Sequence, residues 1–266
     1  VYKRQIRYRL NLGVGVYSGG TMEVDKVDTI CEVLNDFKRI MAEYGVKEYR
    51  ACTTSVFREM KNPLIIIEQI FRRTGIHVEV LSNAEQHFLG YKSIAAIENG
   101  FKKMIQKGTA ILDVGGGNLQ ISLFDKDALV TTQSLKMGSV RIRQRLKELE
   151  KTNTNYAQLV EEFIRNDLTG FKRLYLKDRE IKNLILMGDF LTETIFREER
   201  QDNIITRAEF EKRYENTVYK TETSLSEEMD IDPEYAALIV PTMVICKDFM
   251  DLFNACLLYT SPSPRD

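Results

Sequence analysis

Three consecutive glycines, Gly115, Gly116 and Gly117, form a segment that could hold a phosphate. They follow Asp113 at the end of one apolar stretch, and Asn118 then leads into another. Glycine lets the backbone approach a ligand closely and present N–H groups to an anion. An aspartate at a strand end is suited to holding Mg²⁺ beside bound phosphates. The alternative is a glycine-rich hairpin turn, but a two-residue hairpin needs fewer glycines, so the pattern favours phosphate binding.

The composition is that of a globular protein close to electrical neutrality. The 266 residues include 38 Lys and Arg against 39 Asp and Glu, and 43% are hydrophobic. This balance argues against a disordered chain and against a generally basic nucleic-acid-binding protein. No apolar run reaches the roughly 18 residues of a membrane span. Four scattered cysteines without a CxxC pair and two histidines argue against a zinc site or a disulfide framework, so we expect a cytoplasmic protein.

Apolar periodicity and turn residues predict alternating strands and helices, which is typical of an α/β fold with partly parallel sheets. A polar hinge at 98–108 separates two predicted domains, 6–105 and 106–255. The expected strands are 7–12, 46–53, 77–81, 109–114, 119–124, 128–135 and 183–187. The expected helices are 24–44, 63–74, 83–97, 140–149, 156–171, one from 189, one from a capping box at 206–209, and 233–253.

The two ends lack the patterns of the interior. Residues 1–5 (VYKRQ) join abruptly to the chain, and residues 256–266 (CLLYTSPSPRD) have no periodicity and contain two prolines. Both segments resemble translated sequencing-adapter residue, so we exclude them from the fold prediction. We expect residues 6–255 to be the interior of a longer natural chain.

Several motifs in a fixed order point to a known family. They are DVGGGN at 113–118, TTSVFREMKN at 53–62, EVLSNAEQ at 79–86 and LKMGSVRIR at 135–143. Together they resemble the exopolyphosphatase/guanosine pentaphosphate phosphohydrolase family, over nearly all of residues 6–255. The resemblance implies two ribonuclease-H-like (actin-like ATPase) domains with the active site in the cleft between them. It also implies Mg²⁺-dependent hydrolysis of the terminal phosphoanhydride of inorganic polyphosphate or guanosine pentaphosphate.

The resemblance assigns roles to individual residues. Asp113 matches the metal-binding position, and Gly115–Gly117 with Asn118, where the family commonly has Ser, match the second phosphate loop. Arg58 matches the arginine of the Thr-Ser-x-x-Arg segment, which is expected to contact phosphate oxygens through paired hydrogen bonds. Without the resemblance, Arg58 would be interpreted as a surface arginine before a helix.

Two family glutamates are replaced by glutamine. The presumed catalytic base falls on Gln86, and a glutamate that helps to bind metal or water falls on Gln120. An amide cannot accept a proton from water near pH 7, but it can orient a water molecule. Glu85 is the nearest carboxylate, although a helix turns it about 100° from Gln86 and it also suits a helix start. His87 is interpreted as structural rather than as a replacement base.

Other positions bear on substrate contacts. Arg141 and Arg145 could extend a polyanion track, or could lie on a solvated helix face. Phe190 follows Met187-Gly188-Asp189, where the family tends to have a Gly-Gly-Thr-like turn. The family's first phosphate loop, expected before residues 7–12, is absent, and the last strand and helix of the second domain are expected to be missing after Ala255. We therefore expect this chain by itself to be inactive.

Two functions from different classes follow. The first is a phosphohydrolase that uses Mg²⁺ and acts on polyphosphate or guanosine pentaphosphate. The second is a catalytically impaired protein that binds polyphosphate or guanosine penta- or tetraphosphate, which the two glutamines favour. A kinase of the same superfamily would need an acceptor pocket and an adenosine site that the sequence does not reveal. We expect no membrane or nucleic-acid partner, and a homodimer of the full-length protein stays open.

Overall fold

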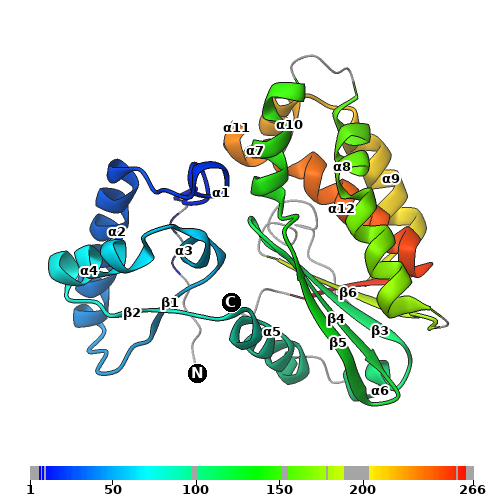
Figure 1. Ribbon diagram of the computed structural model, residues 1–266, viewed down its shortest axis with the longest axis horizontal. Helices are drawn as coiled ribbons and strands as arrows, with labels where there is room; N and C mark the ends of the chain where they lie inside the picture. Colours follow the sequence, from blue (N-terminus) through cyan, green and yellow to red (C-terminus); the bar gives the residue numbers. More distant parts are fainter. Residues whose placement is uncertain are drawn as a thin grey trace. The chain divides into compact units, whose positions relative to one another are not determined.

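The computed structural model describes residues 6, 8, 10–97, 101–150, 155–177, 179–188, 204–255 and 257–261. They form two compact units, 1–86 and 87–266, drawn in Figure 1. The division falls between Gln86 and His87, inside helix α5 (Asn83–Ile97). Both units combine helices with strands, so the predicted α/β class is confirmed.

The first unit is built on a parallel pair of short strands. Its strand β1 (Ala51–Thr53) pairs with β2 (Val78–Val80), and the chain between them forms a helical crossover, as a parallel pair requires. Apolar side chains from the helices form a small core between them and the strands. The helices of this unit are α1 (Val16–Gly19), α2 (Val24–Glu43), α3 (Ser55–Glu59) and α4 (Pro63–Thr74).

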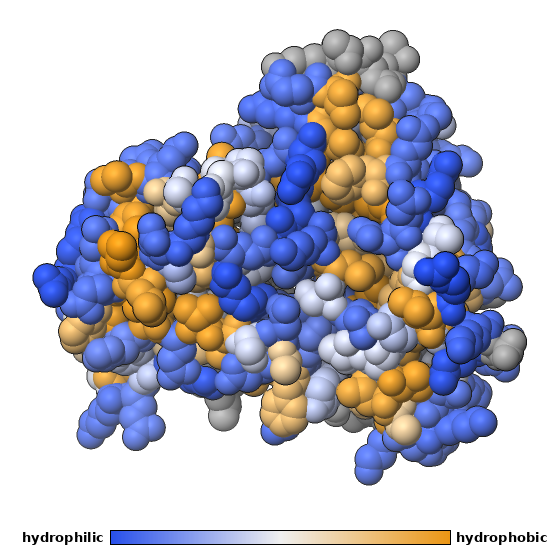
Figure 2. All heavy atoms as spheres, in the orientation of Figure 1, coloured by the Kyte–Doolittle hydropathy of each residue, from blue (hydrophilic) through white to orange (hydrophobic). Residues whose placement is uncertain are grey.

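The helix ends in this unit are those that the sequence predicts. Gly45 and Gly75 follow α2 and α4 with φ of 63° and 72°, the left-handed region in which glycine is favoured. α4 presents one apolar side to the core, while Leu64 and Ile65 are 77% and 58% exposed. Figure 2 shows apolar groups at the surface of this unit.

The predicted strand at 7–12 does not form in its described residues, which have no strand partner there.

The second unit contains a six-stranded mixed sheet with strand order β5-β4-β3-β6-β8-β7. The first three strands along the chain form an antiparallel meander, β6 and then β8 extend it in parallel, and β7 is antiparallel to β8. The strands are β3 (Thr109–Val114), β4 (Leu119–Asp125), β5 (Ala128–Leu135), β6 (Asn183–Met187), β7 (Ile204–Thr206) and β8 (Leu257–Ser261).

Helices cover both faces of this sheet (Figure 1). Alternate strand residues such as Ala110, Leu112 and Val114 join the large core with helices on one face. Those helices include α7 (Ser139–Glu150), α8 (Tyr156–Phe171), α9 (Arg207–Val218), α10 (Glu222–Met229), α11 (Pro233–Ala236) and α12 (Ile239–Phe253), and a π-helical turn, η1 (Lys172–Leu176), continues α8. On the opposite face, Ile111 lies in a smaller cluster with Phe101 of α6 (Phe101–Ile105) and Tyr91 of α5.

This second cluster explains why the units divide earlier than the hinge that we expected at 98–108. Phe101 and Tyr91 pack on the second unit's sheet, so the helices that carry them belong with that sheet rather than with the first unit. Sequence periodicity within each helix gives no information on which sheet it covers. The predicted domain limits at 105 and 106 therefore differ from the division at 86 and 87.

The last described segment is a strand, where we expected no element and a missing final strand. β8 pairs with β6 in parallel, Leu258 lying opposite Leu184, and with β7 in the antiparallel sense. Leu257–Ser261 contains leucine, tyrosine and threonine, residues that fit a pleated strand, and β6 offers it an unpaired edge. Residues 1–5, 256 and 262–266 lie outside the described residues.

The predicted helix at 233–253 is two helices, α11 and α12. Pro241 has no N–H to donate and is tolerated only in the first turn of a helix, so a new helix begins at Ile239 and places the proline there. The capping box at Thr206 and Glu209 is confirmed at the start of α9. None of the described helices combines the length and apolar character needed to cross a bilayer.

Asp248 on α12 is a partly buried carboxyl group with an unusual pKa. Burial, assisted by the nearby charges of Glu161 and Asp251, raises its pKa to about 7, against the opposing influence of Lys247 and Arg165. The unfolded chain has an ordinary aspartate pKa of about 3.9. The folded state therefore binds this proton more tightly, and ionisation of Asp248 opposes folding increasingly between about pH 4 and pH 7.

Asp248→Asn removes this ionisation, so the variant should gain stability over the wild type at pH 8 and gain little at pH 4. We expect a difference on the order of 1–2 kcal/mol, allowing for partial solvent screening. Urea unfolding at both pH values measures it. Asp167→Asn, at an exposed position on α8, is the control. An equal gain at both pH values would contradict the proposed cause.

Candidate functional site

The glycine loop is bonded to the beginning of α7 through three successive carbonyl groups. The carbonyl of Gly115 accepts from Ser139 N at 3.2 Å, that of Gly116 from Arg141 N at 3.0 Å, and that of Gly117 from Gly138 N at 3.1 Å. The first N–H groups of a helix have no acceptor within the helix. The loop therefore caps α7.

This capping fixes where the loop's own N–H groups point. A trans peptide is planar, with its C=O and N–H on opposite sides. Because the carbonyls of Gly115, Gly116 and Gly117 face α7, the N–H groups of the same three peptides, on Gly116, Gly117 and Asn118, point away from it. Successive N–H groups on one side of a turn form a concavity that attracts anions. The predicted phosphate loop thus directs three successive N–H groups away from α7.

Gly138 makes this contact sterically possible. A Cβ atom at this position would lie 2.3 Å from the carbonyl oxygen of Gly116 and 2.5 Å from that of Gly115. No such contact is tolerated between a Cβ and backbone, so any side chain here would force the loop and α7 apart. Sequence reasoning used the segment 135–143 only as part of a family pattern and assigned Gly138 no role. The sequence signal that could have identified Gly138 was a glycine directly before a predicted helix and downstream of a glycine-rich loop.

Arg141 supports the same loop from inside. It is 5% exposed, its Nε donates to the carbonyl of Gly117 at 2.7 Å, and its Nη2 donates to Oδ1 of Asn118 at 3.4 Å. The burial of Arg141 excludes a solvated helix face for this residue, whereas Arg145 is exposed, and a contact of either arginine with a polyanion stays a prediction. Arg141 and Arg145 lie one turn apart on the same side of α7, and it is Arg141, in the first turn, that contacts the glycine loop. The buried guanidinium adds positive charge behind the loop.

Asp113 and Gln120 lie opposite each other in the antiparallel ladder of β3 and β4. Directly opposed residues share one face of a sheet, here the face that α5 and α6 cover. Both side chains line a cavity together with Ser122 and with His87 and Tyr91 of α5. The cavity volume is about 10 Å³, which is on the order of one water molecule. His87 is buried there, and its structural role stays a prediction.

Gln120 carries an unsatisfied amide in this cavity. Its side chain is 3% exposed, and among the described residues neither its Oε1 nor its Nε2 has a hydrogen-bond partner. A buried amide left unpaired costs free energy, so such groups generally have a water, an ion or a ligand as partner. The amide oxygen of Gln120 and the carboxylate of Asp113 are the hard oxygen donors that Mg²⁺ prefers.

The residues present fit a magnesium ion of the kind that is held mainly by phosphates and water. Within the described part of the chain there is no cluster of three or more His, Cys, Asp or Glu side chains that could form a complete metal cage. Mg²⁺ beside phosphates commonly uses only one or two carboxylates and keeps several waters. Asp113 would supply the carboxylate and Gln120, opposite it, an amide oxygen.

The first unit brings together two other predicted residues, Arg58 and Gln86. The Arg58 guanidinium, partly buried, donates from Nη2 to Oε1 of Gln86 at 3.0 Å and from Nη1 to the carbonyl of Leu81 at 2.5 Å. Arg58 is thus held by contacts within the unit rather than extended into solvent as an ordinary surface arginine. The contact also fixes the orientation of the Gln86 amide, whose oxygen lies toward Arg58.

Glu85 has a clear structural role at the start of α5. Its carboxylate accepts from Ser82 N at 2.9 Å, and its own N–H donates to the Ser82 hydroxyl at 3.2 Å, which is a capping box. These hydrogen bonds, with the charge of Arg50 assisting, lower the pKa of Glu85. A lowered pKa makes a carboxylate a weaker proton acceptor, so the geometry favours the helix-start interpretation. Asp189 and Phe190, in the expected nucleotide-contact turn, lie outside the described residues.

Gly138→Ala tests the steric fit of the loop on α7. We expect the variant to lose about 1–3 kcal/mol of stability, the usual cost of overpacking, because the new methyl group collides with backbone. Urea unfolding measures the stability, and amide hydrogen exchange at residues 115–118 should accelerate.

Gly170→Ala is the matched control, since a Cβ there has no neighbour within 4 Å. That change should be neutral or stabilising, because alanine favours helix over glycine. A Gly138→Ala protein with wild-type stability and wild-type exchange would show that the loop does not depend on this contact.

Comparison with known proteins shows which family the chain is similar to. The sequence profile of the Ppx/GppA phosphatase family matches residues 2–263. An exopolyphosphatase structure from Cytophaga hutchinsonii superposes with a TM-score of 0.79 at 18% identity, over 96% of this chain and 83% of that one. A Ppx/GppA family structure from Aquifex aeolicus gives a TM-score of 0.69 at 18% identity, over 96% and 84%.

Curated relatives match over a smaller part of their length. A bifunctional 3-dehydroquinate synthase/phosphatase from Fusobacterium nucleatum is 23% identical over 187 residues, 68% of this chain and 25% of the relative. Exopolyphosphatase 1 from Mycobacterium leprae is 26% identical over 126 residues, 47% of this chain and 36% of the relative. The chain thus aligns with well under two thirds of either relative. With the profile match over nearly its whole length, this chain belongs to the Ppx/GppA phosphatase family.

Proposed function

We propose that the protein is a phosphohydrolase that removes the terminal phosphate from inorganic polyphosphate or guanosine pentaphosphate. The observation that carries the proposal is the row of three loop N–H groups, which the carbonyl contacts to α7 direct to one side. Such groups bind phosphate oxygens and stabilise the charge that develops on them during phosphoryl transfer. The exopolyphosphatases among the relatives supply the substrate class.

The predicted residues of each unit would have separate tasks in this reaction. The N–H groups of Gly116, Gly117 and Asn118 would bind oxygens of the terminal phosphate, with the buried charge of Arg141 behind them. Arg58 would contact phosphate oxygens with its guanidinium, which also donates to Leu81 and Gln86. Mg²⁺ held by Asp113 and Gln120 would supply further charge neutralisation on the phosphates.

At the position expected to orient the attacking water, this chain has an amide, that of Gln86, in place of a carboxylate. Gln86, oriented by Arg58, has an NH₂ donor and no proton affinity near neutral pH. It would orient the attacking water while the proton leaves to the phosphate or to solvent. Because positioning and charge stabilisation supply most of the rate in phosphoryl transfer, slow turnover is compatible with this arrangement.

A second function is favoured by the same two amides. Gln86 and Gln120 replace carboxylates, and the neighbouring carboxylate of Glu85 is engaged in a capping box. A protein with an intact anion loop and a weakened water-activating group would bind polyphosphate or a guanosine penta- or tetraphosphate without rapid turnover. It would then act as a sensor or a regulatory protein.

Release of inorganic phosphate from polyphosphate and from guanosine pentaphosphate, with Mg²⁺, distinguishes these functions. We expect release by the longest natural form of the protein and at least a 10²-fold reduction in Asp113→Asn, the order expected for losing a preorganised electrostatic group. Calorimetric binding is measured in parallel. Ligand binding with no release in either protein would favour the sensor; neither binding nor release would contradict both functions.

Gln86→Glu tests the lost-base explanation. A glutamate here would pair with Arg58 and could accept a proton, so we expect phosphate release to rise by about 10²-fold, the usual contribution of general-base catalysis. Gln86→Met, of similar size, is the control and should not raise the rate. Unchanged release in Gln86→Glu, with ligand binding retained, would show that the missing carboxylate does not limit turnover.

A further inference from the structure

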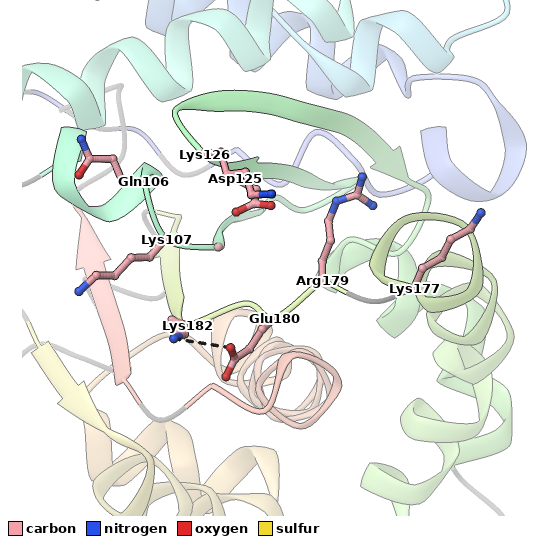
Figure 3. Close-up of a pocket in the computed structure, with 9 residues that line it drawn as sticks. Gln106, Lys107, Asp125, Lys126, Lys177, Arg179, Glu180 and Lys182 are labelled. Atoms are coloured by element: carbon pink, nitrogen blue, oxygen red, sulfur yellow. Dashed lines mark ion pairs between the residues drawn. The ribbon is translucent and has the colours of Figure 1, made fainter.

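Arg58 is held in place by hydrogen bonds, unlike exposed basic side chains elsewhere in the chain. In the second unit, for example, Lys107 and Lys177 are exposed and point in different directions (Figure 3). The Arg58 guanidinium instead donates to two acceptors within the first unit. A group that is to contact a substrate needs its geometry fixed by the residues around it. The segment that carries Arg58 must therefore itself be held.

The α3 helix, which carries Arg58, is too short to be rigid by itself. It contains five residues, Ser55–Glu59, and within the described residues the side chain of Thr54 makes no capping hydrogen bond at its start. Isolated helices of this length are not stable in water, because the first turn is costly to form. Contacts with the rest of the unit must therefore fix both the position of α3 and its rotation about its own axis.

Two sides of α3 are anchored by different kinds of contact. Phe57 is 3% exposed and belongs to the apolar core of the first unit. On another side, the hydroxyl groups of Ser55 and Tyr17 hydrogen-bond to each other at 2.9 Å. Three residues of a helix correspond to a rotation of about 300°, so Arg58 lies within about 60° of Ser55. The contact at Ser55 is thus on the side of the helix from which Arg58 extends.

Tyr17 is held by its own surroundings. It is 7% exposed, and a Cβ atom on Gly13 would lie 2.4 Å from its Cε2 and 2.9 Å from its Cδ2. Because glycine has no side chain, the ring can lie directly against the backbone at Gly13. Tyr17 N also donates to the carbonyl of Gly13 at 3.2 Å. A buried tyrosine hydroxyl usually has a hydrogen-bond partner, and here Ser55 is one.

A second contact joins the other end of α1 to the chain beyond α3. The carbonyl of Gly20, which follows α1, accepts from Lys61 N at 2.9 Å. α1 and α3 are in contact, and Figure 1 shows them close together in the first unit. α1 is therefore bonded to the start of α3 through Tyr17 and to the residues after its end through Gly20. The two hydrogen bonds fix α3 relative to α1 at both ends.

We propose that Tyr17 is a positioning residue for Arg58. Its hydroxyl group holds Ser55, and this contact fixes the rotation of α3. That rotation places the guanidinium of Arg58 against the carbonyl of Leu81 and the amide of Gln86. The inference rests on the proposed function for the contact of Arg58 with phosphate oxygens, but the position of Arg58 can be measured without a substrate.

Tyr17→Phe removes the hydroxyl group and keeps the ring against Gly13. In the whole chain labelled with [¹⁵N]arginine, NMR follows the side-chain N–H groups of Arg58, whose signals are those lost in Arg58→Lys. We expect their exchange with solvent to accelerate about threefold in Tyr17→Phe, within the range that one net hydrogen bond provides. Ser55→Ala should have the same effect, and Tyr17→Phe/Ser55→Ala no larger one, since both changes remove the same contact.

Tyr49→Phe is the matched control. Tyr49 lies in the same unit and is 50% exposed, so this change should leave exchange at Arg58 at the wild-type rate. Gly13→Ala displaces the ring of Tyr17 and keeps its hydroxyl group, so it should accelerate exchange as Tyr17→Phe does. Wild-type exchange at Arg58 in Tyr17→Phe would overturn the proposal. A loss of stability in urea without a change at Arg58 would equally overturn it, because it would assign Tyr17 a purely structural role.

Phosphate release from polyphosphate separates this inference from the proposed function. Tyr17→Phe should raise KM about threefold in the wild-type background, again the order of one hydrogen bond, and should have no effect in an Arg58→Ala background. An equal effect in both backgrounds would show that Tyr17 does not act through Arg58. If Arg58→Ala leaves release unchanged, the proposed role of Arg58 fails, whereas the NMR measurement still decides whether Tyr17 positions it.

Discussion

The candidate site depends on one backbone contact, the capping of α7 by the carbonyl groups of the glycine loop. A helix start needs acceptors, and the loop needs its N–H groups held to one side; the same hydrogen bonds meet both requirements. Gly138 permits the close approach of the loop to α7, and the buried Arg141 donates a hydrogen bond to the carbonyl of Gly117. The proposed anion-binding surface is therefore the reverse side of a helix cap, and its geometry depends on the packing of Gly138 and Arg141 as well as on the glycines.

Successive residues of a strand point to opposite faces of the sheet, so in the second unit the core residues lie on one face and the polar pair Asp113 and Gln120 on the other. Leu112 and its neighbours of the same parity belong to the large helical core, whereas Asp113 and Gln120 face α5 and α6. A polar pair is tolerated on that face because it lies at the end of β3, beside the loop. The result is an oxygen-donor pair adjacent to the proposed anion-binding loop, the combination on which the proposed metal-assisted phosphate reaction rests.

The first unit contributes a guanidinium and an amide that are already hydrogen-bonded to each other. With glutamine at position 86, the contact to Arg58 is a single hydrogen bond between a charged group and a neutral one. The carboxylate one position earlier is used for capping, with Ser82 as its partner. A carboxylate at the start of α5 can either cap the helix or accept a proton. In this chain the carboxylate of Glu85 caps the helix.

The sequence by itself determined the family, the α/β class and most elements of regular structure. The α2 and α4 helices, the capping box at Thr206 and the strands on either side of the glycine loop all follow from local periodicity and turn chemistry. Capping and periodicity are short-range effects, so neighbouring residues suffice to predict them. The glycines, Asp113 and Arg58 could be selected for the same reason, through residue types and ordered motifs.

Only the tertiary structure decided what those residues touch. The burial of Arg141, the requirement for Gly138, the unsatisfied amide of Gln120 and the assignment of α6 to the second unit all depend on contacts between segments distant in sequence. β8 could not be predicted from its own residues for the same reason, because this short segment forms a strand by pairing with the edge of β6. Periodicity gives each segment an apolar face; which partner covers that face is decided by the packing of the whole unit.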